Sequence, residues 1–530
     1  MSNKTIMKKQ TTVTKDHVEK DILKVAKQFR KEFPNSKDEI TRDYYRSHGK
    51  YKTEVEKIYG SFKNVVKTLF PKTGKERSQI DIYKCSKGIK NKRYIVSSII
   101  AGTSIDLKFF ESIKLYAEKK NAEIVLLAMR GVNKNDKFSD EVLNVYGQYI
   151  FTEYEFNQNL KAVDFLLDPS QIISLTGISR MAKKGASLLV GHSKLALEVI
   201  PSLVGEFPSL MYATGTICDV KYRNDRIGRI ASQDHTKSAI VVEIVDQKKF
   251  HVRNIICGKS GEFIDLGICY DKNKMYKINS EAILGDIHAG TECSVAIKAT
   301  EELLKEVGCS KIYLNDLFDA RSVNPHEKDN LFFKYKRPSH QKSLEEDLNY
   351  LGNFIQSFCK DIEDKELFII PSNHNDFVKR YLQSGEFIKD SADSVKLACE
   401  LFQHYFEGID PIEYYLKSRD FLKNIKIKFC NRDDNLISNG FSTPHGDKGN
   451  NGGRGSASSF DKVFNKSITG HSHSPQIFRS SVRVGCLCKL RQAYISGTGS
   501  SWLHSNALTY SNGTFQLIHI IDGSYKLNEK

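Results

Sequence analysis

The apolar positions near the N-terminus recur with the spacing of one helical face. They predict a helix that begins near Asp16 and ends before Phe33, and its apolar face is formed by Val18, Ile22, Val25, Ala26 and Phe29. Residues 38–70 then predict three short helices with turns at Gly49 and at 59–62. Short helices joined by glycine-containing turns are typical of a helix-turn-helix. A small helical bundle that only packs on the rest of the chain is the alternative.

Beyond residue 92 the pattern changes to alternating strands and helices. Residues 93–102 and 122–132 predict strands on either side of a helix at 107–119, and further strands are expected at 186–191, 210–214, 238–246 and 250–258. Such alternation is typical of an α/β layer. We therefore expect an α/β (α+β) protein with three parts: a basic helical arm and linker at 1–92, an α/β domain at 93–280, and a further domain at 281–530. The linker is the basic stretch from 71 onward.

Five short polar blocks in the last part carry candidate chemistry. They read GDIHAG, NDLFD, SNHND, PHGD and GHSHSP. Each of the first three directly follows a predicted strand, and residues two apart at a strand end lie on the same face. Carboxylate, amide and imidazole groups without thiolate suit manganese, iron, zinc or magnesium in an open catalytic site. The candidate ligands are Asp286, His288, Asp316, Asn373, His445, His471 and His473.

In their order and spacing, these blocks resemble the motifs of the calcineurin-like metallophosphoesterases. The resemblance extends from about Ile283 to the C-terminus, and the DLFD and GHSHSP blocks are similar to the nuclease branch, of the SbcD type. It implies a β-sandwich with flanking helices at 281–530. The chain departs from the family at Asn315, where the family has Gly, and at Asn375, where the family has an acid. In the family, neither position supplies a metal ligand.

The resemblance also implies two divalent cations, Mn²⁺ first and Mg²⁺, Fe or Zn²⁺ as alternatives. Asp316 would be shared by both cations, and a hydroxide held between them would attack the phosphoester. His374 would protonate the leaving group or stabilise the charged phosphoryl oxygens, and Asp319 would orient a ligand histidine. The first cation would take Asp286, His288, Asp316 and His473, and the second would take Asp316, Asn373, His445 and His471.

Net charge is concentrated at the N-terminus. Residues 1–93 contain 25 Lys and Arg against 11 Asp and Glu, a net of +14 out of +16 for the whole chain. A segregated basic segment indicates a polyanionic partner, and double-stranded DNA is the first choice. Residues 40–62 also resemble the small DNA-binding repeat found beside homing endonuclease domains. The candidate DNA contacts are Arg42, Arg46, Lys50, Lys52, Lys63 and Lys67, together with Arg454 in a Gly-rich stretch at 446–462 that predicts an irregular loop.

The remaining composition indicates a cytoplasmic protein without a membrane partner. No apolar run is long enough for a membrane span or a secretory signal, so we expect the host cytoplasm if the chain is encoded by a phage. Eleven cysteines, an odd number without repeated close pairs, predict reduced thiols that act as small buried hydrophobes. The sequence leaves a homo-oligomer open.

Together these features favour a metal-dependent DNA phosphodiesterase, a deoxyribonuclease. The overall layout resembles the metallophosphoesterases that some tailed phages make early in infection to degrade host DNA. One alternative is a phosphomonoesterase acting on proteins or nucleotides. This alternative gives no role to the concentration of positive charge at the N-terminus. A DNA-binding regulatory protein with an inactive phosphoesterase domain is the other, and the complete ligand set argues against it.

Overall fold

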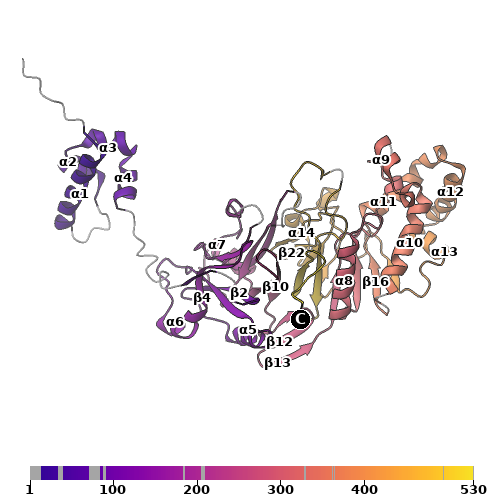
Figure 1. Cartoon of the computed structure of the whole chain (residues 1–530), viewed down its shortest axis with the longest axis horizontal. Coiled ribbons are helices and arrows are strands. Elements are labelled where there is room, and N and C mark those ends of the chain that lie inside the picture. Colours follow the sequence, from indigo (N-terminus) through magenta and orange to yellow (C-terminus); the bar gives the residue numbers. More distant parts are fainter. Residues whose placement is uncertain are drawn as a thin grey trace, which may run out of the picture. The chain divides into compact units, whose positions relative to one another are not determined.

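The computed structural model describes residues 13–33, 40–70, 84–87, 91–182, 186–203, 209–327, 330–360, 362, 364–492 and 495–528. The chain forms two compact units, residues 1–82 and residues 83–530 (Figure 1). Each unit has a hydrophobic cluster of its own, so each buries apolar surface independently of the other.

The first unit consists of the predicted helices. Side-chain oxygens of Thr41 and Ser61 accept hydrogen bonds from backbone N–H groups in the first turns of two of them, and Gly60, with φ 72°, ends a third. The predicted apolar face of the first helix is buried against Tyr45 and Val65. The helices are α1 (Lys15–Glu32), α2 (Arg42–His48), α3 (Lys52–Tyr59) and α4 (Phe62–Leu69).

The second unit contains a fifteen-stranded sheet. Its path runs β10-β9-β2-β3-β4-β5-β6-β8-β7-β21-β22-β20-β19-β18, with β1 added beside β4. The strands are β1 (Lys84–Lys87), β2 (Arg93–Ile100), β3 (Glu123–Met129), β4 (Ile150–Asn157), β5 (Leu160–Val163), β6 (Ser187–Val190), β7 (His192–Ile200), β8 (Ser209–Gly215), β9 (Ser238–Ile244), β10 (Phe250–Ile256), β18 (Ile437–Ser438), β19 (Phe441–Ser442), β20 (Ser467–Thr469), β21 (Gln476–Phe478) and β22 (Ser481–Arg483).

A six-stranded sheet follows the order β17-β16-β15-β14-β23-β24, and its first four strands are parallel. A smaller sheet has the order β11-β12-β13. The bounds are β11 (Phe263–Asp265), β12 (Ile268–Asp271), β13 (Lys274–Lys277), β14 (Ser280–Ile283), β15 (Lys311–Leu314), β16 (Glu366–Ile369), β17 (Ile427–Phe429), β23 (Ser505–Tyr510) and β24 (Phe515–His519).

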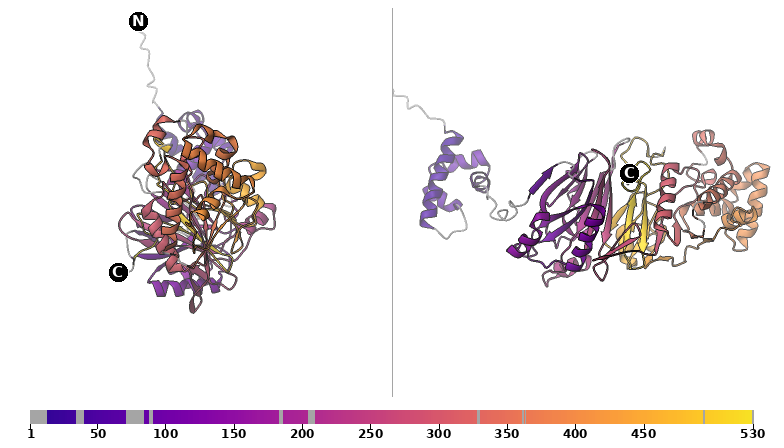
Figure 2. Two further views of the ribbon diagram at one scale, coloured as in Figure 1. Left: turned by 90° about the vertical axis from the view of Figure 1, so that its right-hand side faces the viewer. Right: turned by 60° about the horizontal axis from the view of Figure 1, so that its bottom comes forward.

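Helices cover one face of the six-stranded sheet and the large sheet covers the other. Ala282 of β14 belongs to the cluster under the helices, whereas the next residue, Ile283, belongs to the cluster between the sheets. Figure 2 shows the yellow C-terminal strands between the purple strands and the orange helices. The helices of this unit are α5 (Leu107–Lys120), α6 (Asp140–Tyr146), α7 (Arg226–Asp234), α8 (Ser294–Val307), α9 (Leu331–Lys336), α10 (Leu344–Lys360), α11 (Asn373–Ser384), α12 (Ala392–Phe406), α13 (Pro411–Ser418) and α14 (Ala457–Val463). These layers confirm the α/β (α+β) class.

The predicted boundary between 280 and 281 falls inside the second unit. The large sheet crosses it, because Leu197 of β7 pairs with Ile477 of β21. One hydrophobic cluster likewise combines Val96 and Ile240 with Ile283. Residues 93–280 and 281–530 therefore share a core.

Two predictions about irregular segments are corrected. Part of the expected linker is a strand, because β1 pairs in parallel with β4, and this partner supplies the backbone hydrogen bonds that local composition does not predict. The rest of that linker up to residue 90 lies outside the described residues. The expected loop at 446–462 ends in α14, where Ser456 caps the first turn and Phe460 is buried.

Within the described residues, no helix combines the length and the apolar composition that a membrane span requires.

Candidate metal centre

The carboxyl ends of three parallel strands meet at the centre. Asp286 and His288 follow β14, Asp316 follows β15, and Asn373 begins α11 after β16. In an open α/β sheet this edge is where ligands bind, because the strand ends and helix starts leave polar groups there. The remaining predicted ligands, on loops after β19 and β20, are His445, His471 and His473.

The backbone at several of these ligands is left-handed. The φ angles are 51° at His288, 40° at Asp316, 68° at His471 and 57° at His473. Such conformations are uncommon for residues other than glycine and cost of the order of 1–3 kcal/mol each. Their concentration at the predicted ligands is typical of a functional site whose surroundings hold it in place.

Around His473, the first predicted group of ligands is assembled. The Nε2 atom of His473 is 3.1 Å from Asp286 Oδ2 and 3.1 Å from His288 Nε2. His288 Nε2 is in turn 3.5 Å from Asp316 Oδ2. All four side chains are buried, so a cation among them would be shielded from bulk water.

Asp316 also faces the second group. Its Oδ2 atom is 3.4 Å from His445 Nε2, and the ring centroids of His445 and His471 are 5.2 Å apart. Asp286, Asp316 and His445 each present a ligand atom within 4.8 Å of the others. Asp316 thus lies in contact with both groups, the position that a shared carboxylate requires.

The buried oxygen atoms of this centre show whether its side chains would suit bound cations. Asp286 Oδ1, Asp316 Oδ1 and Asn373 Oδ1 have no hydrogen-bond partner among the described residues. A buried polar atom without a partner costs about 1–3 kcal/mol. Divalent cations would satisfy these oxygens, and the mixture of oxygen and imidazole donors suits them.

Protonation states also fit metal binding. Burial raises the pKa of the Asp316 carboxyl, but nearby imidazoles, that of His374 first, outweigh burial and hold this pKa well below its usual range. The pKa of Asp286 is lowered as well, because His473 and His445 outweigh burial. Burial lowers the pKa of His471 to about 4. Ionised carboxylates and a neutral imidazole are the forms that bind metal.

The two predicted catalytic residues contact each other beside the ligands. His374 Nδ1 is 2.7 Å from the backbone oxygen of Asp319 and 3.5 Å from its carboxylate, which is also 3.4 Å from His288 Nδ1. A carbonyl oxygen only accepts, so His374 Nδ1 carries a proton. Burial lowers the pKa of His374, but Asp316 and Asp319 raise it to about 10. His374 Nε2 lies 3.9 Å from Asp316 Oδ2.

Three further residues support the ligands and were not predicted to do so. Asn315 Oδ1 lies 3.3 Å from His445 Nδ1, so it can orient this predicted ligand. Gly470 allows close approach, since a Cβ there would lie 2.2 Å from Asp286 Oδ1. Trp502 has its ring centroid 4.1 Å from that of His473. In the sequence, the one signal for a supporting role of Asn315 and Gly470 is their position inside two of the polar blocks, NDLFD and GHSHSP.

A cavity of about 440 Å³ opens onto the centre. Its lining includes Asn373 and His374, and it also contains the guanidinium-bearing residues Arg321 and Arg380. Arg321 pairs with Glu327, whereas Arg380 is exposed and has no acidic partner among the described residues. The cavity therefore brings a cationic side chain close to the predicted metal ligands.

The predicted DNA contacts do not form part of this cluster. In the first unit Lys50, Lys52 and Lys63 are exposed, and Arg42 and Arg46 both pair with Glu56. The side chain of Lys67 lies outside the described residues. Arg454 is an exposed residue between β19 and α14, where Lys448 and Arg454 form an isolated bridge.

Fold and site together define an α/β protein with buried groups of histidine, aspartate and cysteine that could hold metal ions. The chain is similar to Protein A1 of Escherichia phage T5, with 26% identity over 467 residues that cover 82% of this chain and 83% of that protein. This similarity fits a phage origin. No protein-family model and no solved structure matches the chain significantly.

Proposed function

We propose that this chain is a metal-dependent phosphodiesterase that hydrolyses DNA. The observation that carries the proposal is the convergence of the predicted ligands from five separate blocks. Buried oxygens of Asp286, Asp316 and Asn373 there accept no hydrogen bond from any residue that the structure describes. When bound, two divalent cations would supply a hydroxide nucleophile at neutral pH and neutralise charge on the phosphoryl oxygens. The ligand set suits Mn²⁺ and accommodates Mg²⁺, Fe or Zn²⁺.

The protein's own groups account for the rest of the reaction. The backbone oxygen of Asp319 holds the Nδ1 proton of His374, which leaves Nε2 to face Asp316 and the cavity. A protonated His374 can then donate from Nε2 to the leaving oxygen as the P–O bond breaks. Asp319 also lies beside His288 Nδ1 and orients that ligand, the role expected of a carboxylate behind a metal-bound imidazole.

DNA is favoured as the substrate by the charge distribution. The first 93 residues carry nearly all of the net charge, which suits contact with a phosphate backbone. Arg380 adds an exposed cation to the cavity beside the metal ligands. Similarity to a phage protein is consistent with an enzyme that degrades DNA in the infected cell, although the name of that relative, Protein A1, states no activity.

The proposal is tested by incubating the purified chain with linear and circular duplex DNA and Mn²⁺, and by mapping the ends produced. We expect cleavage of linear DNA that stops when a chelator removes the metal. Cutting of the circle would assign endonuclease action. If the protein binds metal but hydrolyses only a small phosphomonoester such as p-nitrophenyl phosphate, the phosphatase alternative is correct. If it binds DNA but hydrolyses neither, the inactive regulatory alternative is correct.

A further inference from the structure

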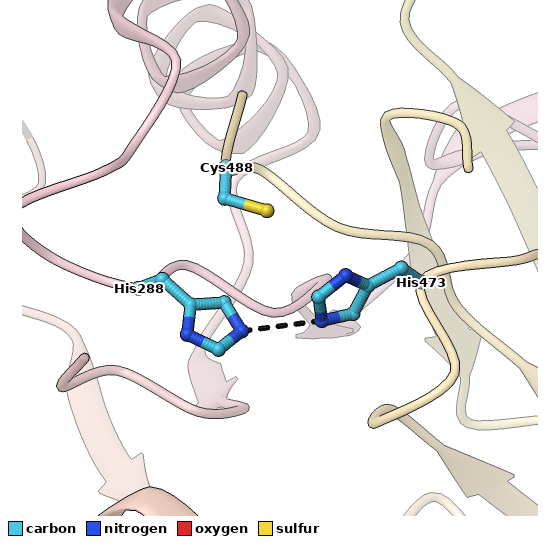
Figure 3. Close-up of side chains that lie close together, drawn as sticks. All are labelled: His288, His473 and Cys488. Carbon is cyan, nitrogen blue, oxygen red and sulfur yellow. Dashed lines mark hydrogen bonds between the residues drawn. The ribbon is translucent and has the colours of Figure 1, made fainter. Parts of the chain in front are cut away.

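A cysteine lies directly beside the ligands of the first group. Cys488 presents its sulfur within 4.8 Å of a ring nitrogen of His288 and one of His473, and all three side chains are buried. Figure 3 shows the sulfur turned toward the two imidazole rings. His473 Nδ1 is buried without a hydrogen-bond partner among the described residues, and Asp286 Oδ2 lies 3.1 Å from Nε2 of the same ring. Sulfur and imidazole donors therefore surround one point, and a carboxylate contacts one of the imidazoles.

Backbone hydrogen bonds fix this sulfur relative to the other donors. The N–H of Leu487 donates to the carbonyl of Asp286 at 2.7 Å, and the N–H of Lys489 donates to that of Thr291 at 3.0 Å. The N–H of Cys293 donates to Leu487 at 2.8 Å. The segment that carries Cys488 is thus bonded to both ends of the loop that carries His288. Such preorganisation is what a metal ligand requires.

The surroundings of Cys488 differ from those of the cysteines that fill the core. Cys269 and Cys309 belong to the hydrophobic cluster under the helices, as expected of small buried hydrophobes. Cys488 instead lines the cavity at the metal centre, together with polar residues such as Asp319 and Gln492. Its neighbours are the Cys486 side chain and two imidazoles of the predicted metal centre, so Cys488 differs from the cysteines that contact only apolar side chains.

We infer that Cys488 supplies a sulfur ligand to the cation held by Asp286, His288 and His473. The inference rests on the metal centre of the proposed function and adds a donor that the predicted ligand set lacks. On binding, the S–H proton is released to solvent and the sulfur lone pair forms the bond to the cation. Soft sulfur favours Zn²⁺, Fe²⁺ or Co²⁺ over Mg²⁺ and Mn²⁺.

With a sulfur ligand in one half only, the two halves of the metal centre differ in the cations that they prefer. The half with Cys488 would select a thiophilic cation, whereas the half with Asp316, Asn373, His445 and His471 has only oxygen and imidazole donors and accepts Mn²⁺ or Mg²⁺. We expect the isolated protein to retain Zn²⁺ or Fe²⁺ in the first half during dialysis and to exchange the second cation readily.

Cobalt spectroscopy of the full chain tests this assignment without relying on catalysis. Co²⁺ added to the metal-free protein should give visible ligand-field bands and, in the near ultraviolet, a sulfur-to-cobalt charge-transfer band. Cys488→Ser should lose the charge-transfer band and keep the ligand-field bands. Cys309→Ser is the matched control, since Cys309 is also buried but lies in the hydrophobic cluster under the helices, and it should keep both.

Competition between metals provides a second measurement. After dialysis against equal Zn²⁺ and Mn²⁺, Cys488→Ser should show Zn²⁺ affinity reduced by at least about 100-fold, more than is typical for loss of an outer partner, with little change for Mn²⁺. Trp502, the single tryptophan, lies beside His473 and reports the folded centre by its fluorescence before metal is added. Equal fluorescence of the metal-free variants shows that they are folded.

Two outcomes separate this inference from the function on which it rests. Ligand-field bands without a charge-transfer band in the unaltered protein, or retention of that band in Cys488→Ser, would overturn the role of Cys488 and leave the metal centre standing. Failure of the unaltered protein to bind any cation would overturn the metal centre and the phosphodiesterase proposal together.

Discussion

The basic side chains that the structure describes in the first unit are exposed. In the second unit, five of the predicted metal ligands are buried and contact one another at 3.1–3.5 Å: Asp286, His288, Asp316, His445 and His473. Exposed charges on a helical surface act nearly independently, because water screens each from the next. Buried ligands that bind the same cations would depend on each other. We therefore expect changes in the first unit to have graded effects on DNA binding, and changes in the second to abolish the reaction as a whole.

The largest effect is expected from Asp316→Asn, which removes the charge of the carboxylate that contacts both ligand groups. Both predicted cations lose a charged ligand, so DNA cleavage should fall by more than about 100-fold, the upper end for loss of an outer partner. Metal content, measured by elemental analysis after dialysis, should fall with it. Asp461→Asn removes a carboxylate of the same unit that pairs with Arg479, and serves as the control. Retention of both metals in Asp316→Asn would show that the ligands do not act as a unit.

His374→Ala separates chemistry from metal binding inside the second unit. Loss of a general acid typically lowers turnover by about 10²–10⁴-fold. His374 is not a predicted ligand, so the metal content should stay unchanged, and the KM for DNA should change much less than kcat. His404→Ala, on α12, is the control. Equal losses of metal and activity would assign His374 to the ligand set instead.

The same contrast explains how much of the molecule could be predicted from sequence. The candidate ligands could be proposed because the first three blocks follow predicted strands and all five blocks contain residues that are able to bind metal. The helices of the first unit were recognisable from local spacing and capping. The contacts of Cys488 and Asn315 could not be predicted from the sequence, because they depend on which distant segments lie beside His288 and His445. The shared core of 93–280 and 281–530 depends in the same way on the pairing of β7 with β21.

A smaller, graded effect is expected in the first unit. Replacing Lys50, Lys52 and Lys63 by Gln should weaken DNA binding and make its dependence on salt less steep. Each lost phosphate contact lowers the slope of log K against log salt by about 0.9, so three contacts lower it by about 2.7. Binding measured by fluorescence anisotropy over a salt series gives this slope. Cleavage at saturating DNA should be nearly unchanged.

A matched triple variant controls for net charge. Lys274, Lys389 and Lys396 are exposed residues of the second unit, and their replacement by Gln removes the same charge. An equal change of slope in this control would mean that DNA responds to total charge and not to a surface of the first unit.

The smallest effect concerns stability in acid. Burial lowers the pKa of His519 to about 3, and its ring nitrogens pair with the hydroxyls of Tyr212 at 2.7 Å and Ser505 at 3.0 Å. Burial also lowers the pKa of His251 to about 4. In the described part of the first unit, by contrast, the histidines are exposed. Acid should therefore unfold the second unit first.

The direction in which pH changes the folding stability follows from proton uptake by the unfolded chain. Below pH 6.5 the unfolded chain protonates His519 while the folded chain does not, so folding stability falls as pH drops from about 6.5 toward 3, by about 1.4 kcal/mol per pH unit for one such histidine. His519→Gln keeps a hydrogen-bonding side chain and removes this titration. Its unfolding free energy, followed by Trp502 fluorescence in urea, should lose less on going from pH 7 to pH 5 than that of the unaltered protein. Equal losses would show that His519 does not make the second unit sensitive to acid.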